Sequence, residues 1–249
     1  GGGSSAAPTL PGLDPIEATS IEATRATITL DGQTDDWANV PSLAVPLAAI
    51  PDWARDSTFG NDVTVTLATV FDDANIYVLI AVPAGYGYDP DNLHLSPAVA
   101  VQWVVSDGAG AAMGSVGPDF TESGGMVDIW HWTLECGPGE LSGGVFPTGN
   151  DPGCNLDDEY ATLTDEREDD DSENSLTGSW DHTGRSSGVG ADGAFVFEIG
   201  RPLGTGDPQD AQFQVGDTVQ LAIAYWDANE GREKDGGWSA AGHVTSANI

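Results

Sequence analysis

Very few side chains in this sequence could bind a transition-metal ion. There are two methionines, four histidines, two cysteines and a single lysine, Lys234. No CxxCH motif is present, so a covalently attached c-type haem is excluded, and non-covalent haem, another cofactor or no cofactor remain. A thioether raises the reduction potential of haem iron, and a lysine can bind iron only after losing a proton of pKa about 10.4. Two such protein ligands would leave no open position on the iron, so the site would pass electrons and would not transform a bound molecule.

The sequence surroundings distinguish the candidate ligands. Met113 lies in a Gly/Ala-rich loop (GAGAAMGS), an unusual position for a core methionine, whereas Met126 begins an apolar strand and is predicted to lie in the core, with a reserve role as ligand. Lys234 stands in a charged turn (NEGREKDGG), where a solvated lysine would be ordinary. It is nevertheless the only lysine of the chain. Strongly acidic proteins tend to lose lysines that have no function. His243 is the substitute for Lys234 as ligand.

The segment 127–132 (VDIWHW) places a histidine between two tryptophans. Because side chains alternate along a strand, Trp130 and Trp132 should share one face and His131 should lie on the other. His131 could then be a haem-edge residue, a buried structural histidine or a ligand, and one or two strand tryptophans could line a haem. Arg201 could meet a haem propionate or, as we favour, pair with a carboxylate in the core. His182 is expected to be solvated in a polar loop.

The two cysteines, Cys136 and Cys154, flank a Gly/Pro/Asn-rich stretch. In an exported protein they would pair and close a short loop, which would stabilise the fold by roughly 3 kcal/mol. A metal-binding pair is the alternative, but no CxxC spacing supports it.

The charge balance limits the partners of this chain. Forty Asp and Glu residues against seven Lys and Arg give a net charge of −33. Such a surface repels nucleic acid and anionic lipid, and it suits very salty water, where the Debye length falls to roughly 3 Å. A disordered acidic chain is excluded by the 39% of hydrophobic residues, the eight tryptophans and the regular short apolar runs.

Those apolar runs have the length and alternation of strands. Residues 63–70 (VTVTLATV), a turn at 71–75 and residues 76–82 (IYVLIAV) predict a β-hairpin. Further strands are predicted at 26–30, 99–105, 127–134, 194–199 and 219–226. Only 36–39 and 207–212 suggest helical turns. Many short strands with turn-rich connections predict an all-β, antiparallel β-sandwich.

The chain is predicted to hold one sandwich domain over residues 21–249, preceded by a flexible tether over residues 1–20. Because such a tether commonly follows an export signal or a lipid-bearing cysteine, we expect an exported protein whose only membrane contact would be an N-terminal anchor. Residues 137–193 are expected to form a long acidic insertion. Its acid run, 166–173 (EREDDDSE), lacks the ligand spacing of a calcium loop.

Several separated segments together resemble one family. Residues 30–32 (LDG) and 35–37 (DDW), with the 63–82 hairpin, are similar to the opening of sandwich domains related to family 9 carbohydrate-binding modules. Residues 98–103 (AVAVQW), 127–132 and 219–227 (VQLAIAYWD), with Met113-Gly114 and Arg201-Pro202-Leu203 between them, narrow the match. These segments resemble the haem-b-binding γ subunit of ethylbenzene dehydrogenase and its relatives in the dimethyl-sulfoxide-reductase superfamily.

The resemblance implies a haem b bound without covalent attachment at one end of the sandwich, with Met113 and Lys234 as the iron ligands. Trp130, His131 and Arg201 would be further cofactor-binding residues. It also implies a cytochrome b subunit, not itself an enzyme. This subunit would exchange electrons with an iron–sulfur subunit attached to a molybdopterin catalytic subunit outside the cytoplasm.

Two other functions remain open from the sequence. One is a non-catalytic carbohydrate- or surface-ligand-binding module of the same sandwich type, with exposed tryptophans as stacking platforms. The other is a structural domain of a surface layer or filament. An enzyme acting alone has no support, because the sequence shows no Ser-His-Asp ordering, no Gly-rich phosphate loop and no zinc spacing.

Overall fold

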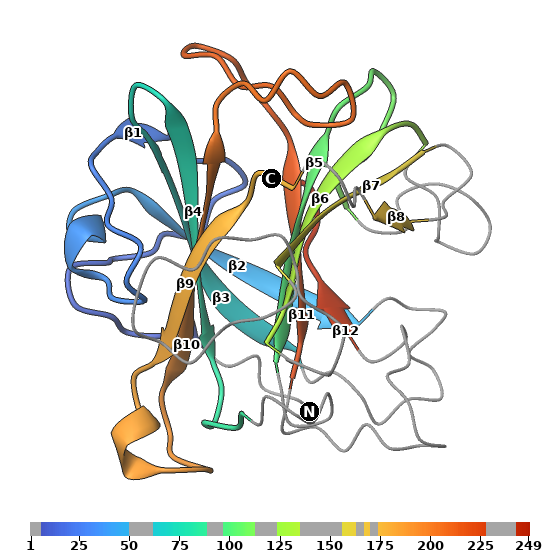
Figure 1. Ribbon diagram of the computed structural model, residues 1–249. Helices are drawn as coiled ribbons and strands as arrows, with labels where there is room; N and C mark the ends of the chain where they lie inside the picture. Colours follow the sequence, from blue (N-terminus) through green and yellow to red (C-terminus); the bar gives the residue numbers. More distant parts are fainter. Residues whose placement is uncertain are drawn as a thin grey trace, which may run out of the picture.

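The computed structural model describes residues 6–49, 62–88, 97–112, 124–134, 156–162, 167–169, 174–227 and 243–249. These residues form two packed layers of strands (Figure 1). The first layer contains β1 (Thr24–Arg25), β2 (Ser42–Ala49), β3 (Val63–Phe71), β4 (Asn75–Pro83), β9 (Thr177–His182) and β10 (Ala194–Pro202). The second contains β5 (Ala98–Val104), β6 (Val127–Thr133), β7 (Leu156–Ala161), β8 (Arg167–Asp169), β11 (Leu221–Trp226) and β12 (His243–Thr245).

The strands follow the order β8-β7-β6-β5-β11-β12-β2-β3-β4-β10-β9, with β1 beside β3. All of these pairs are antiparallel except β1 with β3. The two layers are joined along one side by β2, whose residues 42–47 pair with β3 and whose last residues, Ala48 and Ala49, pair with β12. The predicted all-β antiparallel sandwich is confirmed.

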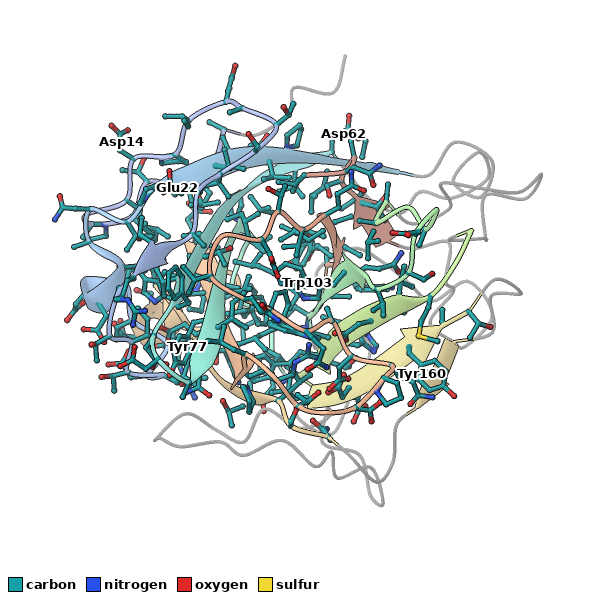
Figure 2. The ribbon with its side chains drawn as sticks, turned by 90° about the horizontal axis from the view of Figure 1, so that it is seen from above. Asp14, Glu22, Asp62, Tyr77, Trp103 and Tyr160 are labelled. Atoms are coloured by element: carbon teal, nitrogen blue, oxygen red, sulfur yellow. The ribbon has the colours of Figure 1, made fainter. Side chains whose placement is uncertain are left out.

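The main core lies between the two layers. The predicted hairpin is β3–β4, and alternate residues such as Val65, Leu67 and Ile80 point into this core. Trp103, Trp130 and Trp132 enter it from the second layer, and Trp103 is labelled among the packed side chains of Figure 2. Because Trp130 and Trp132 share this inner face, the predicted alternation of VDIWHW is confirmed.

The N-terminal segment covers the outer face of the first layer. Leu10, Leu13, Ile28, Leu30 and Trp37 bury their side chains there. The predicted strand at 26–30 is wrong, since only Thr24–Arg25 pair as a strand and residues 26–30 lie across the sheet as cover. The one helical turn found near the predicted 36–39 is η1 (Asp35–Trp37), a single 3-10 turn. No helix in the described ranges is long and apolar enough to cross a membrane.

The stretch 137–193 differs from the predicted surface insertion. Three strands, β7, β8 and β9, lie within it, and β7 and β9 belong to the two layers of the sandwich. Asp158 and Trp180 from these strands are each only 1% exposed. β7 (LDDEYA) was not predicted as a strand because its sequence is rich in acids. Its carboxylate Asp158 nevertheless points into the core toward Arg201.

Candidate functional site

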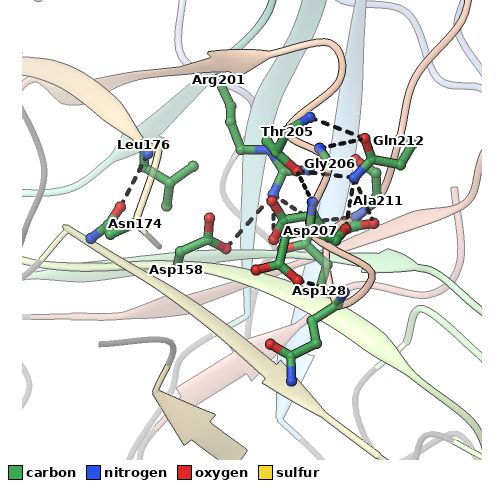
Figure 3. A network of polar contacts seen from close by, with 12 residues as sticks. Asp128, Asp158, Asn174, Leu176, Arg201, Thr205, Gly206, Asp207, Ala211 and Gln212 are labelled. Carbon is green, nitrogen blue, oxygen red and sulfur yellow. Dashed lines mark hydrogen bonds and ion pairs between the residues drawn. The ribbon is translucent and has the colours of Figure 1, made fainter. Parts of the chain in front are cut away.

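One arginine and three aspartates meet between the two layers (Figure 3). Arg201 lies on β10 of the first layer, and its Nη1 is 2.7 Å from Asp128 Oδ2 on β6 of the second layer. The same Nη1 is 3.6 Å from Asp158 Oδ1 on β7 and 3.4 Å from Asp210 Oδ1 in the segment after β10. We call these four residues the Arg201 cluster. It connects β10 with β6 and β7, so it joins the first layer to the second.

The Arg201 cluster is buried and tightly held. Arg201 is 1% exposed, and its Nη2 donates to Ala211 O at 2.6 Å, while Ala211 N donates to Asp128 Oδ2 at 2.8 Å. The guanidinium carbon lies 4.9 Å from the ring centroid of Trp130 and 5.7 Å from that of Phe213, within the range of cation–π attraction. Two roles were expected for Arg201, and the structure shows the second one, a pairing with carboxylates in the core.

Burial raises the pKa of both strand carboxyls in the cluster. For Asp128, desolvation outweighs the Arg201 charge and raises the pKa to about 6. For Asp158, desolvation and the neighbouring Asp128 charge raise the pKa to about 8. Three carboxylates with oxygens within 4.8 Å of one another can hold a cation, and here the cation is the Arg201 guanidinium. The cluster is therefore an ionic joint of the fold.

A second buried carboxylate lies beneath the N-terminal cover. Glu198 on β10 is 0% exposed and accepts hydrogen bonds from Trp37 Nε1 at 2.7 Å, Gly32 N at 2.5 Å and Asp31 N at 2.9 Å. Desolvation raises the pKa of Glu198 to about 7 against the lowering effect of these donors. The site fixes the turn at 31–37 on the first layer.

The outer face of the second layer carries an aromatic and polar patch. The rings of His131 on β6 and Trp226 on β11 approach to 5.3 Å between centroids, although β5 lies between these strands. This approach is possible because β5 presents only Ala98 and Ala100 beneath the two rings. His131 Nδ1 lies 3.3 Å from Glu159 Oε1. On its other side, Nε2 lies 3.4 Å from Thr133 Oγ1. We call His131, Trp226, Thr133 and Glu159 the outer patch.

The described residues that precede Met113 and Lys234 in the chain lie near opposite ends of β5. Met113 lies outside the described residues, but its neighbour Ala112 donates to Asn248 Oδ1 at 2.6 Å, close to the pair of Leu221 with Trp103. Lys234, also outside the described residues, follows Trp226, which pairs with Ala98. Trp103 and Ala98 are separated by roughly 17 Å along β5, at about 3.4 Å per residue.

The remaining expected cofactor residues do not converge. Trp130 and Arg201 meet on the inner face of the second layer, whereas His131 lies on its outer face with a carboxylate and a hydroxyl at its two ring nitrogens. Met126 is half-buried where the chain enters β6, and its backbone N–H donates to Ser106 Oγ at 2.7 Å. His243 begins β12, and its side chain is not described. The described candidates lie on both faces of the second layer, and the haem site with Met113 and Lys234 as iron ligands stays a prediction.

The other candidate tryptophans and histidines are buried or lie outside the described residues. The six described tryptophans are all 7% exposed or less, so none of them offers an open stacking surface. Trp53 and Trp238 lie outside the described residues. His182, expected in solvent, is 2% exposed, because its Nε2 lies 2.8 Å from Ala84 O and its Nδ1 accepts from Gly184 N at 2.9 Å. Burial lowers the pKa of His182.

Sequence reasoning missed the carboxylates of the Arg201 cluster. Asp128 alternates with Trp130 and Trp132, so the same pattern that placed the tryptophans inside also placed this aspartate inside. That signal was available. Asp158 and Asp210 gave none, because the chain holds 40 acidic residues and composition cannot separate a buried carboxylate from a solvated one.

No family model and no curated protein matches the sequence. Among solved structures, the chain is similar to a family 9 carbohydrate-binding module from Caldicellulosiruptor kristjanssonii in complex with cellotriose, with 11% identity, a TM-score of 0.41 and coverage of 91% of this chain and 82% of that one. The module in complex with glucose matches with 13% identity, a TM-score of 0.41 and coverage of 92% and 84%. A protein from Bacteroides uniformis with a provisional carbohydrate-binding description matches with 7% identity, a TM-score of 0.48 and coverage of 91% and 88%.

The classification of the chain as a haem- and iron-containing cytochrome b of electron transport, with a disulfide, is corrected. The solved structures that it matches are described as carbohydrate-binding, and no disulfide occurs in the part of the chain that the structure describes. Cys136 and Cys154 lie outside that part. The iron–sulfur and molybdopterin partners and the export of the chain stay predictions.

Proposed function

We propose that this chain is a non-catalytic β-sandwich module that binds a carbohydrate polymer through the outer patch of its second layer. The observation that carries the proposal is the meeting of His131 and Trp226 across Ala98 and Ala100, with hydrogen-bonding groups on either side. The proposal includes a location outside the cell, which the acid-rich composition favours.

The chemistry of the outer patch suits a sugar. A pyranose ring has an apolar face of C–H groups that packs against aromatic rings, and its hydroxyls both donate and accept hydrogen bonds. His131, whose side chain is 14% exposed, supplies the ring surface that solvent reaches and packs against the buried ring of Trp226, while Glu159 supplies acceptors and Thr133 a hydroxyl that donates and accepts. A rigid sheet holds all four side chains, which limits the entropy lost when a ligand binds.

The patch lies where several strands end. Trp226, Ala98, Thr133 and His243 occupy one row across β11, β5, β6 and β12. The inner tryptophans of the same layer pack in the core, whereas His131 and Trp226 lie on its outer face.

The test is retention on insoluble cellulose, chitin and starch, measured by depletion in multimolar KCl. We expect wild-type protein to bind at least one of these polymers, and His131→Ala and Trp226→Ala each to weaken binding by about tenfold, equivalent to about 1.4 kcal/mol. Tyr77→Ala is the matched control, because Tyr77 is a partly buried aromatic residue on the first layer. No retention on any polymer, or equal losses in all three variants, would contradict the proposal.

A further inference from the structure

The Arg201 cluster contains more negative charge than its one cation can balance. Arg201 supplies a single positive charge, and Asp128, Asp158 and Asp210 would supply three negative charges if all were ionised. All four side chains are at most 4% exposed, so solvent does not screen them. An uncompensated charge in such a place is costly, and a buried carboxyl commonly takes up a proton instead.

The hydrogen bonding of the cluster has the same imbalance. Each carboxyl places one oxygen within 3.6 Å of Arg201 Nη1. Among the described residues no N–H or hydroxyl group donates to the other oxygens, Asp128 Oδ1, Asp158 Oδ2 and Asp210 Oδ2, whereas only one donor of the cluster, Arg201 Nε, lacks an acceptor. A buried acceptor without a donor is destabilising, and a proton on one carboxyl converts an acceptor into a donor for its neighbour.

The structure points to a proton that is retained at neutral pH within the Arg201 cluster, shared between the carboxyls of Asp128 and Asp158. We propose this proton as a switch built into the joint between the two layers: its loss in alkaline solution leaves the joint with excess negative charge and weakens the packing of β7 and β6 against β10.

The charged groups that face Asp158 support this assignment. They are Asp128 on β6, Arg201 on β10 and Asp210 in the segment after β10, so two of the three oppose its ionisation. The pKa of Asp158 is raised by desolvation first and then by the Asp128 charge, and a hydrogen bond with Asp128 raises it further. Two carboxyl groups can form a hydrogen bond with each other only if one of them is protonated.

The sign of the pH effect follows from this raised pKa. The folded protein holds the proton more tightly than the unfolded chain does, so stability from this group is complete below the unfolded pKa and is lost as pH rises toward about 8. Multimolar salt screens the exposed acids but not this buried cluster, so the loss should persist in high salt.

The experiment compares proton uptake on folding, obtained from the pH dependence of the unfolding free energy between pH 5 and pH 9 in multimolar KCl, for wild type and Asp158→Asn. We expect uptake to fall by about one proton in Asp158→Asn, because its amide supplies the donor without titrating. Asp14→Asn, a change at an exposed acid, should leave uptake unchanged. Equal uptake in wild type and Asp158→Asn would overturn the proposal.

A spectroscopic readout covers the case in which Asp158→Asn does not fold. The infrared spectrum of the folded protein at pH 7 should show the carbonyl stretch of a protonated carboxylic acid. The band should persist in Glu198→Gln, which removes the other buried carboxyl of raised pKa. Loss of the whole band in Glu198→Gln, or its absence from wild type, would overturn the proposal.

Discussion

Two buried carboxylate sites among the described residues, Glu198 and the Arg201 cluster, have opposite ratios of donors to acids. Glu198 is one carboxylate with three N–H donors, and all three belong to the turn that covers the first layer. The Arg201 cluster is three carboxylates around one guanidinium, and it spans the two layers. Each site includes one residue of β10, Glu198 or Arg201, and burial raises the pKa of carboxyls in both.

The difference shows that a buried carboxyl group can have two structural roles. At Glu198 both carboxyl oxygens accept from N–H donors, so the site needs an acceptor, and its removal should release the cover. In the Arg201 cluster positive charge is scarce, so neutralising one acid should be tolerated and removing the cation should not. Substitutions that exchange charge without changing shape separate these two behaviours.

The largest effect is expected for Arg201→Met. This change leaves three buried carboxylates without a cation, and breaking a buried pair from one side costs about 3–5 kcal/mol. Denaturant unfolding in multimolar KCl, followed by tryptophan fluorescence, measures the loss.

Arg25→Met is the matched control, because Arg25 pairs with Asp73 at the surface, where its side chain is 56% exposed. Exposed pairs contribute little, so this variant should unfold like wild type. Similar losses in Arg201→Met and Arg25→Met would mean that the cluster is not an ionic joint.

Glu198→Ala should have the next largest effect. It leaves Trp37 Nε1 and two backbone N–H groups without their acceptor, at a cost of about 2–3 kcal/mol. Glu198→Gln should lose less, because one acceptor oxygen remains. Because the damage is confined to the cover, hydrogen exchange should rise at residues 31–37 before it rises in β5 and β6. Uniform exchange across both layers would contradict this local role.

A smaller loss of stability is expected for a substitution at an uncharged contact between the two layers. A Cβ atom added to Gly178 on β9 would lie 2.6 Å from Trp132 Cζ3 and 3.0 Å from Leu156 Cδ2. Gly178→Ala should therefore cost about 1–3 kcal/mol by overpacking. Gly204→Ala is the control, since its Cβ would approach only Gln212 Oε1, at 3.6 Å. Equal melting temperatures for the two variants would show that the interface adapts and that the Arg201 cluster alone sets the spacing of the layers.

Much of the sandwich could be predicted from alternation alone. The β3–β4 hairpin and β5, β6, β10 and β11 follow from apolar runs of strand length. β2 was missed because it contains Pro46, which is tolerated there since β2 pairs with β12 only at Ala48 and Ala49 and lacks a second partner beside Pro46.

The candidate sites could be predicted only in part. The pattern VDIWHW gives the face of every residue in β6, including Asp128 inside and His131 outside. It cannot show that Trp226 reaches His131 across β5, because this depends on the order of strands in the layer. The link from Asp158 to Arg201 joins residues of different layers, and in so acidic a chain only the folded structure identifies it.

The most direct test of the contrast between the two sites is one pair of isosteric substitutions at pH 9 in multimolar KCl. At this pH, above the raised pKa of about 8 for Asp158 and about 7 for Glu198, both carboxyls are ionised. Asp158→Asn removes surplus charge and should leave the unfolding free energy equal to or above that of wild type. Glu198→Gln replaces an acceptor oxygen with an amide NH2 group that faces N–H donors, and should lower it. A loss of stability in both variants would contradict the account of the Arg201 cluster as a joint with too little positive charge.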